Sequence, residues 1–387
     1  MIRGFENWLP ALRRKQRPIE NALGTRHVMI AVCNRFEPSQ RAALDGKPAL
    51  LENWRRDLSK LAHEFHDAHG IAPKHSFFLP AEEAEAAWIP ELGELCRTTG
   101  NEIELTAPRP IESAERLRET IQRGKDSLSR HGWLSCDKTG AVRYGFIQGA
   151  KASSSSRLVS HRAILRETGC YANFLPPEFA DGVPPEFDNS LCYAYDRDQK
   201  GRPSGLRRVR AEREPQSDID DGVLLVPPPV TRDWNRKKFG LLPHLETSEL
   251  SAAKPPSRDR LRLWLDCRIT VEARPNWVFI TLHTNGLEPE NSRMLLGEPM
   301  REFYRTLTKV AARDESLRFH CVTAREFINI LHAAEAGHSG NPSQFKEFRY
   351  SAPAAFSDGT ADCGEIPVAE RRSDPAEAAS ESALEAS

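Results

Sequence analysis

Two residues that follow or end predicted strands could transfer protons. Glu37 comes shortly after the apolar run 27–32, and His283 ends the run 277–283, the strongest strand signal in the chain. In a parallel α/β barrel the strands end at one face, and catalytic residues lie there. A carboxylate and an imidazole at that face could act as general base and acid. The structural alternatives are an ion pair between Glu37 and Arg35, and a hydrogen bond from His283 to a backbone carbonyl.

A second group of polar residues could bind a ligand at the same face. Asn34 and Arg35 end the first strand, Arg109 follows the third, and Asn285 follows the strongest one. His161 precedes a short predicted helix and could line the opening. Guanidinium groups bind carboxylates or phosphates through paired hydrogen bonds, so two arginines at neighbouring strand ends favour an anionic or sugar ligand. The alternative is that these side chains make only solvated contacts.

Composition excludes several classes of protein. The 54 basic and 55 acidic residues nearly cancel, so no overall field favours nucleic acid. No run reaches the ~18 apolar residues of a membrane helix, and no apolar segment follows the basic residues near the N-terminus. The eight cysteines are scattered without a CxxC pair, which is typical of free buried thiols. We therefore expect a cytoplasmic protein with no membrane span.

Short apolar runs alternate with amphipathic stretches along most of the chain. Strands are predicted at 27–32, 76–79, 102–105, 142–147, 171–174, 191–195, 222–226, 277–283 and 317–322. Helical stripes are predicted at 51–65, 88–95, 117–128, 163–167, 261–265, 299–312 and 324–336. Strands that alternate with helices predict a mainly parallel α/β sheet. About seven such units favour closure into a barrel.

The same pattern divides the chain into parts. Residues 1–25 are predicted to be an N-terminal extension, and 26–340 the barrel domain, with a polar insertion at about 196–221. Residues 351–387 are rich in Ala, Ser, Glu and Pro with few large apolar residues. Such a segment buries too little surface to offset its ordering entropy, so we expect a disordered tail.

Seven blocks of the sequence together resemble the polysaccharide-deacetylase-like superfamily, whose type is the nodulation chitooligosaccharide deacetylase. The blocks are HVMIAVCNRFEP (27–38), HSFFLP (75–80), YGFIQG (144–149), LRETGCYANF (165–174), WVFITLHTNG (277–286), LGEPM (296–300) and VTARE (322–326). The similarity covers about 26–337. It implies a distorted parallel (β/α)7 barrel with its active site at the carboxyl ends of the strands.

The resemblance also implies a metal site, from which this sequence departs. Family members carry an acidic pair with histidine after the first strand and a histidine cluster after the third, which together hold a divalent cation. Here Asn34 and Arg35 replace the first group, and Thr106, Pro108 and Arg109 replace the second. Asn is no base, and Arg places a fixed positive charge in the site. We therefore expect neither cofactor nor metal.

Two hypotheses follow from these departures. The first is a deacetylase-like barrel protein of cell-envelope or exopolysaccharide metabolism that binds a glycan, an acylated sugar or an envelope-polysaccharide enzyme without hydrolysis. The second is a carbohydrate-active hydrolase, a deacetylase or a glycosidase, with a non-standard site formed by Glu37 and His283. Stoichiometric metal in the purified protein would favour the second hypothesis, and the cofactor would then be a divalent metal.

Overall fold

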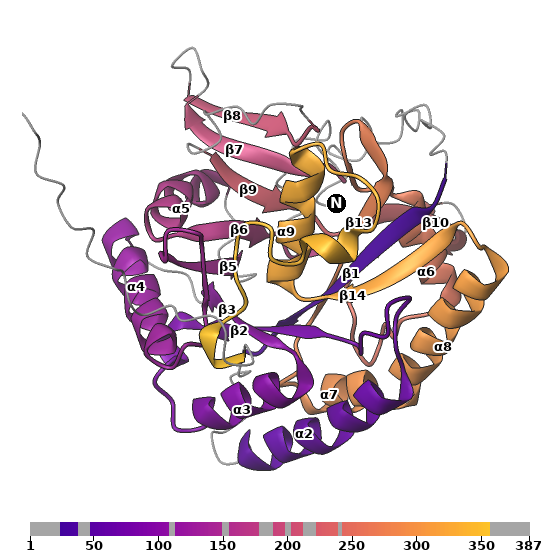
Figure 1. Ribbon diagram of the computed structural model, residues 1–387, viewed down its shortest axis with the longest axis horizontal. Coiled ribbons are helices and arrows are strands. Elements are labelled where there is room, and N and C mark those ends of the chain that lie inside the picture. Colours follow the sequence, from indigo (N-terminus) through magenta and orange to yellow (C-terminus); the bar gives the residue numbers. More distant parts are fainter. Residues whose placement is uncertain are drawn as a thin grey trace, which may run out of the picture.

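The computed structural model describes residues 24–37, 47–107, 113–148, 155–177, 189–197, 203–211, 222–238 and 242–356 (Figure 1). Within them lies a twelve-stranded, mostly parallel sheet. Its parallel strands are β1 (Arg26–Arg35), β2 (His75–Pro80), β3 (Glu102–Ala107), β5 (Val142–Gln148), β6 (Cys170–Phe174), β9 (Gly222–Val226), β13 (Arg274–Thr284) and β14 (Leu317–Val322). Antiparallel strands extend it: β4 (Ser135–Cys136), β7 (Cys192–Arg197), β8 (Pro203–Arg208) and β12 (Thr270–Val271).

Helices cover the sheet on both faces. They are α2 (Lys47–Glu64), α3 (Ile89–Thr99), α4 (Ala114–Arg130), α5 (Ser155–Glu167), α6 (Arg258–Asp266), α7 (Pro289–Leu296), α8 (Glu298–Arg313) and α9 (Ala324–Glu335), with short 3-10 turns η2 (Ala81–Glu83), η7 (Pro342–Phe345) and η8 (Ala354–Phe356). A separate two-stranded ribbon joins β10 (Val230–Lys238) to β11 (Leu242–Thr247). Figure 1 shows α2, α3, α4 and α8 along the outside and α9 against the middle of the sheet.

β1 is the central strand, and its side chains alternate between two cores. Val28, Ile30 and Val32 lie in the core that α2, α3 and α8 cover. Met29, Ala31 and Cys33 lie in the core that holds α9. We call the α9 side the inner face. Every residue of α9 is buried, so this helix fills the inner face instead of presenting a polar side to solvent.

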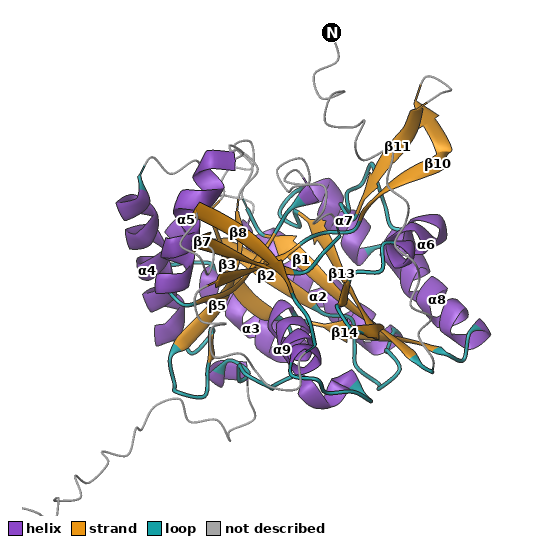
Figure 2. Cartoon of the chain, turned by 90° about the horizontal axis from the view of Figure 1, so that it is seen from above, coloured by secondary structure: helices purple, strands orange, loops and turns teal. Residues whose placement is uncertain are grey.

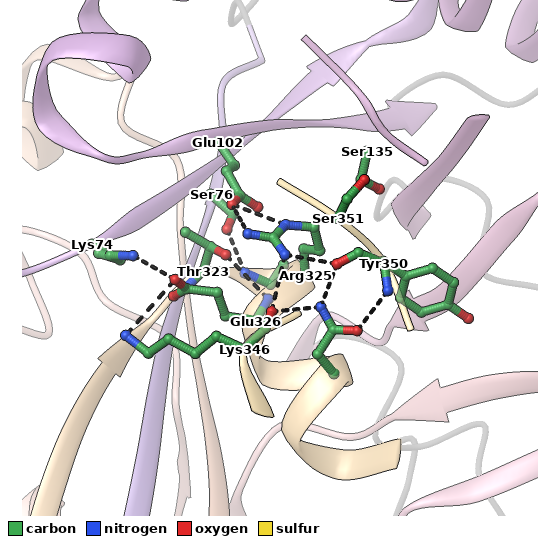
Figure 3. Close-up of polar contacts among 12 residues, drawn as sticks. Lys74, Ser76, Glu102, Ser135, Thr323, Arg325, Glu326, Lys346, Tyr350 and Ser351 are labelled. Atoms are coloured by element: carbon green, nitrogen blue, oxygen red, sulfur yellow. Dashed lines mark hydrogen bonds and ion pairs between the residues drawn. The ribbon is translucent and has the colours of Figure 1, made fainter. Parts of the chain in front are cut away.

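The charged residues of α9 are buried because partners from distant strands reach them. Arg325 donates to Glu102 Oε1 through Nε at 3.1 Å and Nη2 at 2.8 Å, and to the carbonyl oxygen of Tyr350 at 2.9 Å (Figure 3). Glu326 accepts from Lys74 at 2.6 Å and closes a capping box with Thr323. We call this network, at the amino ends of β2 and β3, the closed end.

The two margins of the sheet approach each other through one short segment. The residues after β8 form backbone hydrogen bonds with Glu272, which lies between β12 and β13. Ala211 N donates to Glu272 O at 2.8 Å, and Glu272 N donates to Val209 O at 2.9 Å. The margin of the sheet that β7 and β8 form is thereby linked to the margin that β12 and β13 form.

The predicted α/β class is confirmed, and each predicted strand overlaps a strand of the sheet; 317–322 coincides with β14. The described residues add detail to two of the predicted segments. The polar insertion 196–221 contains β8, which pairs with β7 and satisfies its backbone groups. The predicted tail begins at Ser351, yet Ser351 N donates to Cys136 O at 2.9 Å and Ala355 N to Gly132 O at 3.0 Å. Residues 357–387 and 1–23 lie outside the described part.

Two further sequence expectations concern membrane helices and cysteines. In the part of the chain that the structure describes, no helix is long and apolar enough to cross a membrane. The cysteines of that part are free thiols, and Cys33 is fully buried. Burial raises the pKa of Cys33 well above its usual value, so this thiol is not a nucleophile.

Candidate functional site at the carboxyl ends of the strands

Glu37 connects the ends of three strands. The Thr106 hydroxyl, at the end of β3, lies 3.1 Å from Glu37 Oε1 and 2.8 Å from the carbonyl oxygen of Ile147 on β5. Asn285, just after β13, donates from Nδ2 to the Glu37 carbonyl oxygen at 3.1 Å. Together with Arg35 and His283, these side chains lie at the carboxyl ends of parallel strands. We call Arg35, Glu37, Thr106, His283 and Asn285 the mouth.

His283 lies on the inner face, beside the end of β1. It is opposite Cys33 in the register, and its ring is 1% exposed. Burial first, and the charge of Arg35 second, lower the pKa of His283 to about 3. The imidazole is therefore neutral at neutral pH, with one donor and one acceptor nitrogen.

The hydrogen bonds of His283 are incomplete within the described residues. Nε2 lies 3.3 Å from Thr281 Oγ1, a long contact, and Nδ1 has no partner. A buried polar atom without a partner costs free energy comparable to a lost hydrogen bond. The ring therefore has hydrogen-bonding capacity that a ligand could use.

Asn34 faces the other way, because alternation along β1 places it on the helix-covered side. Its Oδ1 accepts from Gly286 N at 2.7 Å, and the Trp54 indole donates to Gly286 O at 3.3 Å. A Cβ at Gly286 would lie 2.6 Å from Asn34 Nδ2, closer than real Cβ atoms approach. Asn34 thus holds the turn after β13, and its use in ligand binding stays a prediction.

The other predicted site residues are placed less directly. Asn285 Oδ1 accepts from Leu287 N at 3.1 Å, so the Asn285 side chain shapes the same turn while binding Glu37. His161 does not precede a helix but lies within α5, which begins at Ser155 and packs against β6, β7 and β9. Arg109 lies outside the described residues.

The mouth does not fit the metal site that the resemblance implies. A divalent cation needs two imidazoles and a carboxylate, or a similar donor set. The described mouth offers one imidazole and one carboxylate, with a guanidinium close enough to lower the pKa of that imidazole. Among the described residues, no three His, Cys, Asp or Glu side chains lie close enough to hold a metal ion. We therefore derive no step through a metal.

A second carboxylate, deeper on the inner face, was not singled out as a site residue from the sequence. Glu104 is 3% exposed and accepts hydrogen bonds from the Tyr171 hydroxyl and Gly145 N. Burial raises the pKa of Glu104 to about 8, although these two hydrogen bonds oppose the shift. Glu104 is therefore mainly protonated at neutral pH. The signal was the alternation Glu102, Glu104, Thr106 along one face of an otherwise apolar strand.

One wall of the mouth comes from the segment after β11. His283 N donates to Ser248 O at 3.0 Å, and Leu250 N donates to His283 O at 2.7 Å. The Oγ of Ser248 and the Oγ1 of Thr284 are also buried without a hydrogen-bond partner within the described residues. Several polar atoms around the ends of β1 and β13 therefore lack partners.

Comparison with known families and with curated proteins adds no relative. Neither the models of known protein families nor the curated proteins match the chain. The function must therefore be argued from the mouth itself.

Proposed function

We propose that the chain is a polysaccharide-deacetylase-like barrel protein that binds a glycan or an acylated sugar at the mouth without metal-dependent deacetylation. Its proposed setting is cell-envelope or exopolysaccharide metabolism in the cytoplasm, alone or beside an envelope-polysaccharide enzyme. The observation that carries the proposal is the buried neutral His283, whose Nδ1 has no partner among the described residues, beside Arg35 at the carboxyl end of β13.

Two features of the sheet support the barrel. Seven strands run parallel in the order β13, β1, β2, β3, β5, β6, β9. The backbone hydrogen bonds of Val209 and Ala211 to Glu272 link the two margins of the sheet. A closed parallel barrel would put all its strand ends around one opening, where α/β barrels bind their ligands.

The chemistry of the mouth supports a ligand rich in hydroxyl, amide or anionic groups. A neutral imidazole can both donate and accept, and the Thr106 hydroxyl and the Glu37 carboxylate, 3.1 Å apart, lie at the ends of other strands. The guanidinium of Arg35 can add a charged donor for an acyl oxygen or a carboxylate. These groups match the hydroxyl and acylamino substituents of a sugar.

The hydrolase hypothesis depends on Glu37 rather than on His283. A group whose pKa is about 3 is a weak base at neutral pH, and proton transfer is most efficient when the pKa lies near the working pH. A half-buried carboxylate at a strand end can still act as a base. Loss of turnover in Glu37→Gln would therefore mark an enzyme of altered mechanism.

A titration with acetylated chito-oligosaccharides in the presence of a chelator tests the proposal. We expect the wild type to bind. In His283→Gln the affinity should fall about tenfold or more, because the ligand group that bonds to the imidazole would lose its hydrogen-bond partner in a buried position. His75→Gln is the matched control. His75 is equally buried, also carries a lowered pKa, and begins β2 on the helix-covered side of the sheet, against Trp54.

Three outcomes would contradict the proposal. One is equal binding by both variants, which would place the ligand elsewhere. Another is release of acetate that depends on added zinc, which would restore the metal-dependent reaction. A third is the absence of binding to every acetylated or acidic oligosaccharide tried.

A further inference from the structure

The β10–β11 ribbon carries an unusual exposed surface. Figure 2 shows the ribbon extending away from the main sheet. Trp234 on β10 is 55% exposed and Leu245 on β11 is 36% exposed, and they are the exposed large apolar side chains of the described part. Exposed apolar side chains that gather on one element mark an interaction site.

The charges of the ribbon are segregated. β10 has the sequence VTRDWNRKK, with four basic residues and one acid, and β11 adds the single acid Glu246. Arg236 is exposed, whereas Asp233 and Glu246 are both buried. Among the charged side chains of the ribbon that the structure places, the exposed one, Arg236, is therefore a cation.

Contacts with α6 and within the ribbon hold the two acids inward. Glu246 Oε1 accepts from Arg260 Nε at 2.8 Å and from Trp264 Nε1 at 3.1 Å. Asp233 Oδ1 accepts from Asn235 N at 2.9 Å. Arg232 pairs with Leu245 in the register, so these two share the side opposite Asp233. Trp234 and Arg236 follow in the irregular stretch between Asp233 and Lys237, and both are exposed.

We infer that the outer side of the β10–β11 ribbon docks the protein on an anionic lipid surface. Tryptophan lies at the level of lipid headgroups, and clustered Lys and Arg residues are attracted to anionic lipids. A sugar chain would meet carboxylates that accept from its hydroxyl groups, but both acids of the ribbon face inward. The combination of an exposed aromatic ring, an exposed leucine and an exposed arginine fits lipid better.

Docking on this side would bring the mouth close to the lipid surface. β11 continues into Ser248–Leu250, whose backbone is hydrogen-bonded to His283. The ribbon therefore stands beside the mouth. The inference does not depend on what the mouth binds.

Sedimentation of the full chain with vesicles tests this inference. We expect the wild type to bind vesicles of phosphatidylcholine mixed with phosphatidylglycerol, and not vesicles of phosphatidylcholine alone. Arg236→Glu should weaken binding by about tenfold or more, because each charge near an anionic surface counts for roughly a factor of five. Trp234→Ala should weaken it without changing its dependence on salt.

Arg313→Glu is the matched control, since Arg313 is an exposed arginine in the last turn of α8 and gives the same change of net charge. It should bind as the wild type does. Equal losses in Arg236→Glu and Arg313→Glu would overturn the inference, as would wild type that binds neither kind of vesicle. Sedimentation with polygalacturonate instead of vesicles would also overturn it and identify an acidic glycan as the partner. Circular dichroism checks that each variant is folded.

Discussion

The two ends of the inner face treat buried polar groups in opposite ways. At the closed end, Arg325 has Glu102 and two backbone carbonyls, and Glu326 has Lys74 and the backbone nitrogen of Thr323. At the mouth, Nδ1 of His283 lacks a partner within the described residues. The closed end is paired except at Glu102 Oε2, again within the described residues, and stabilises the fold. The unpaired nitrogen of His283 costs stability and keeps capacity for a ligand.

The same contrast is repeated within β3. Glu102 and Glu104 are two residues apart, face the same side and are both buried. Glu102 is paired with a guanidinium, while Glu104 has Tyr171 and Gly145 as partners and is mainly protonated. Burial alone therefore does not decide the charge of a carboxylate; its partner does.

The largest effect is expected for Glu102→Gln. It leaves Arg325 buried beside a neutral amide, and loss of one partner of a buried ion pair costs about 3–5 kcal/mol. We expect a drop of that order in the free energy of unfolding, measured with urea at pH 7. A change as small as that of a surface substitution would show that the closed end does not stabilise the fold.

A smaller loss is expected for Gly286→Ala, which tests the turn beside the mouth. The new Cβ would lie 2.6 Å from Asn34 Nδ2 and 2.7 Å from Trp54 Cζ2. Overpacking of this kind costs about 1–3 kcal/mol. Since Asn34 makes the closest contact, Gly286→Ala and Asn34→Ala should be non-additive in a double-mutant cycle. Strict additivity would contradict this account of the turn.

The pH dependence of the free energy of unfolding should distinguish the contribution of His283 from that of His75. The pKa of His283 falls from 6.5 in the unfolded chain to about 3, so as the pH drops below 6.5 only the unfolded state takes up the proton. Wild-type stability should fall from pH 6.5 towards pH 3. His283→Gln and His75→Gln should each flatten this fall, His75→Gln only down to about pH 4. If the free energy of unfolding of both variants falls with decreasing pH as steeply as that of the wild type, the lowered pKa values are contradicted.

The smallest effect is expected for Glu104→Gln at acidic pH. Near pH 4 the carboxyl group is mainly protonated in the folded and the unfolded state, so replacing it with an amide should change the free energy of unfolding by less than about 1 kcal/mol. The difference in stability between the wild type and the variant should grow as the pH rises. In the unfolded wild type Glu104 loses its proton near pH 4.5 and in the folded state near 8, so the wild type loses stability between these values. The variant should not lose stability over this range. If the free energies of unfolding of wild type and variant depend on pH in the same way, Glu104 is ionised in the folded state.

The alternation along the chain predicted the strands well, because apolar runs with polar flanks depend only on local sequence. It also predicted the last helix, and the structure adds a capping box at its start, formed by Thr323 and Glu326. Alternation on β1 also separates Asn34 from Arg35, since neighbours on a strand face opposite sides. That distinction was available from the sequence and was not drawn.

Other features could not be read from local sequence. The burial of α9 depends on Glu102, Lys74 and Tyr193, which neutralise or bind its polar residues from elsewhere in the chain. The β10–β11 ribbon has a basic, polar first strand whose pattern is that of a solvated loop. Its strand character depends on pairing with β11, which no local pattern reveals.

The central claim is that the imidazole of His283 keeps a free hydrogen-bonding position for a ligand. Long-range proton–nitrogen spectra of the histidine side chains, recorded while an acetylated chito-oligosaccharide is added in the presence of a chelator, test it directly. The account predicts a neutral ring for His283, a shift of its Nδ1 signal on binding, and no shift for His75. A charged His283 at pH 7, or a ligand that shifts His75 and leaves His283 unchanged, would contradict it.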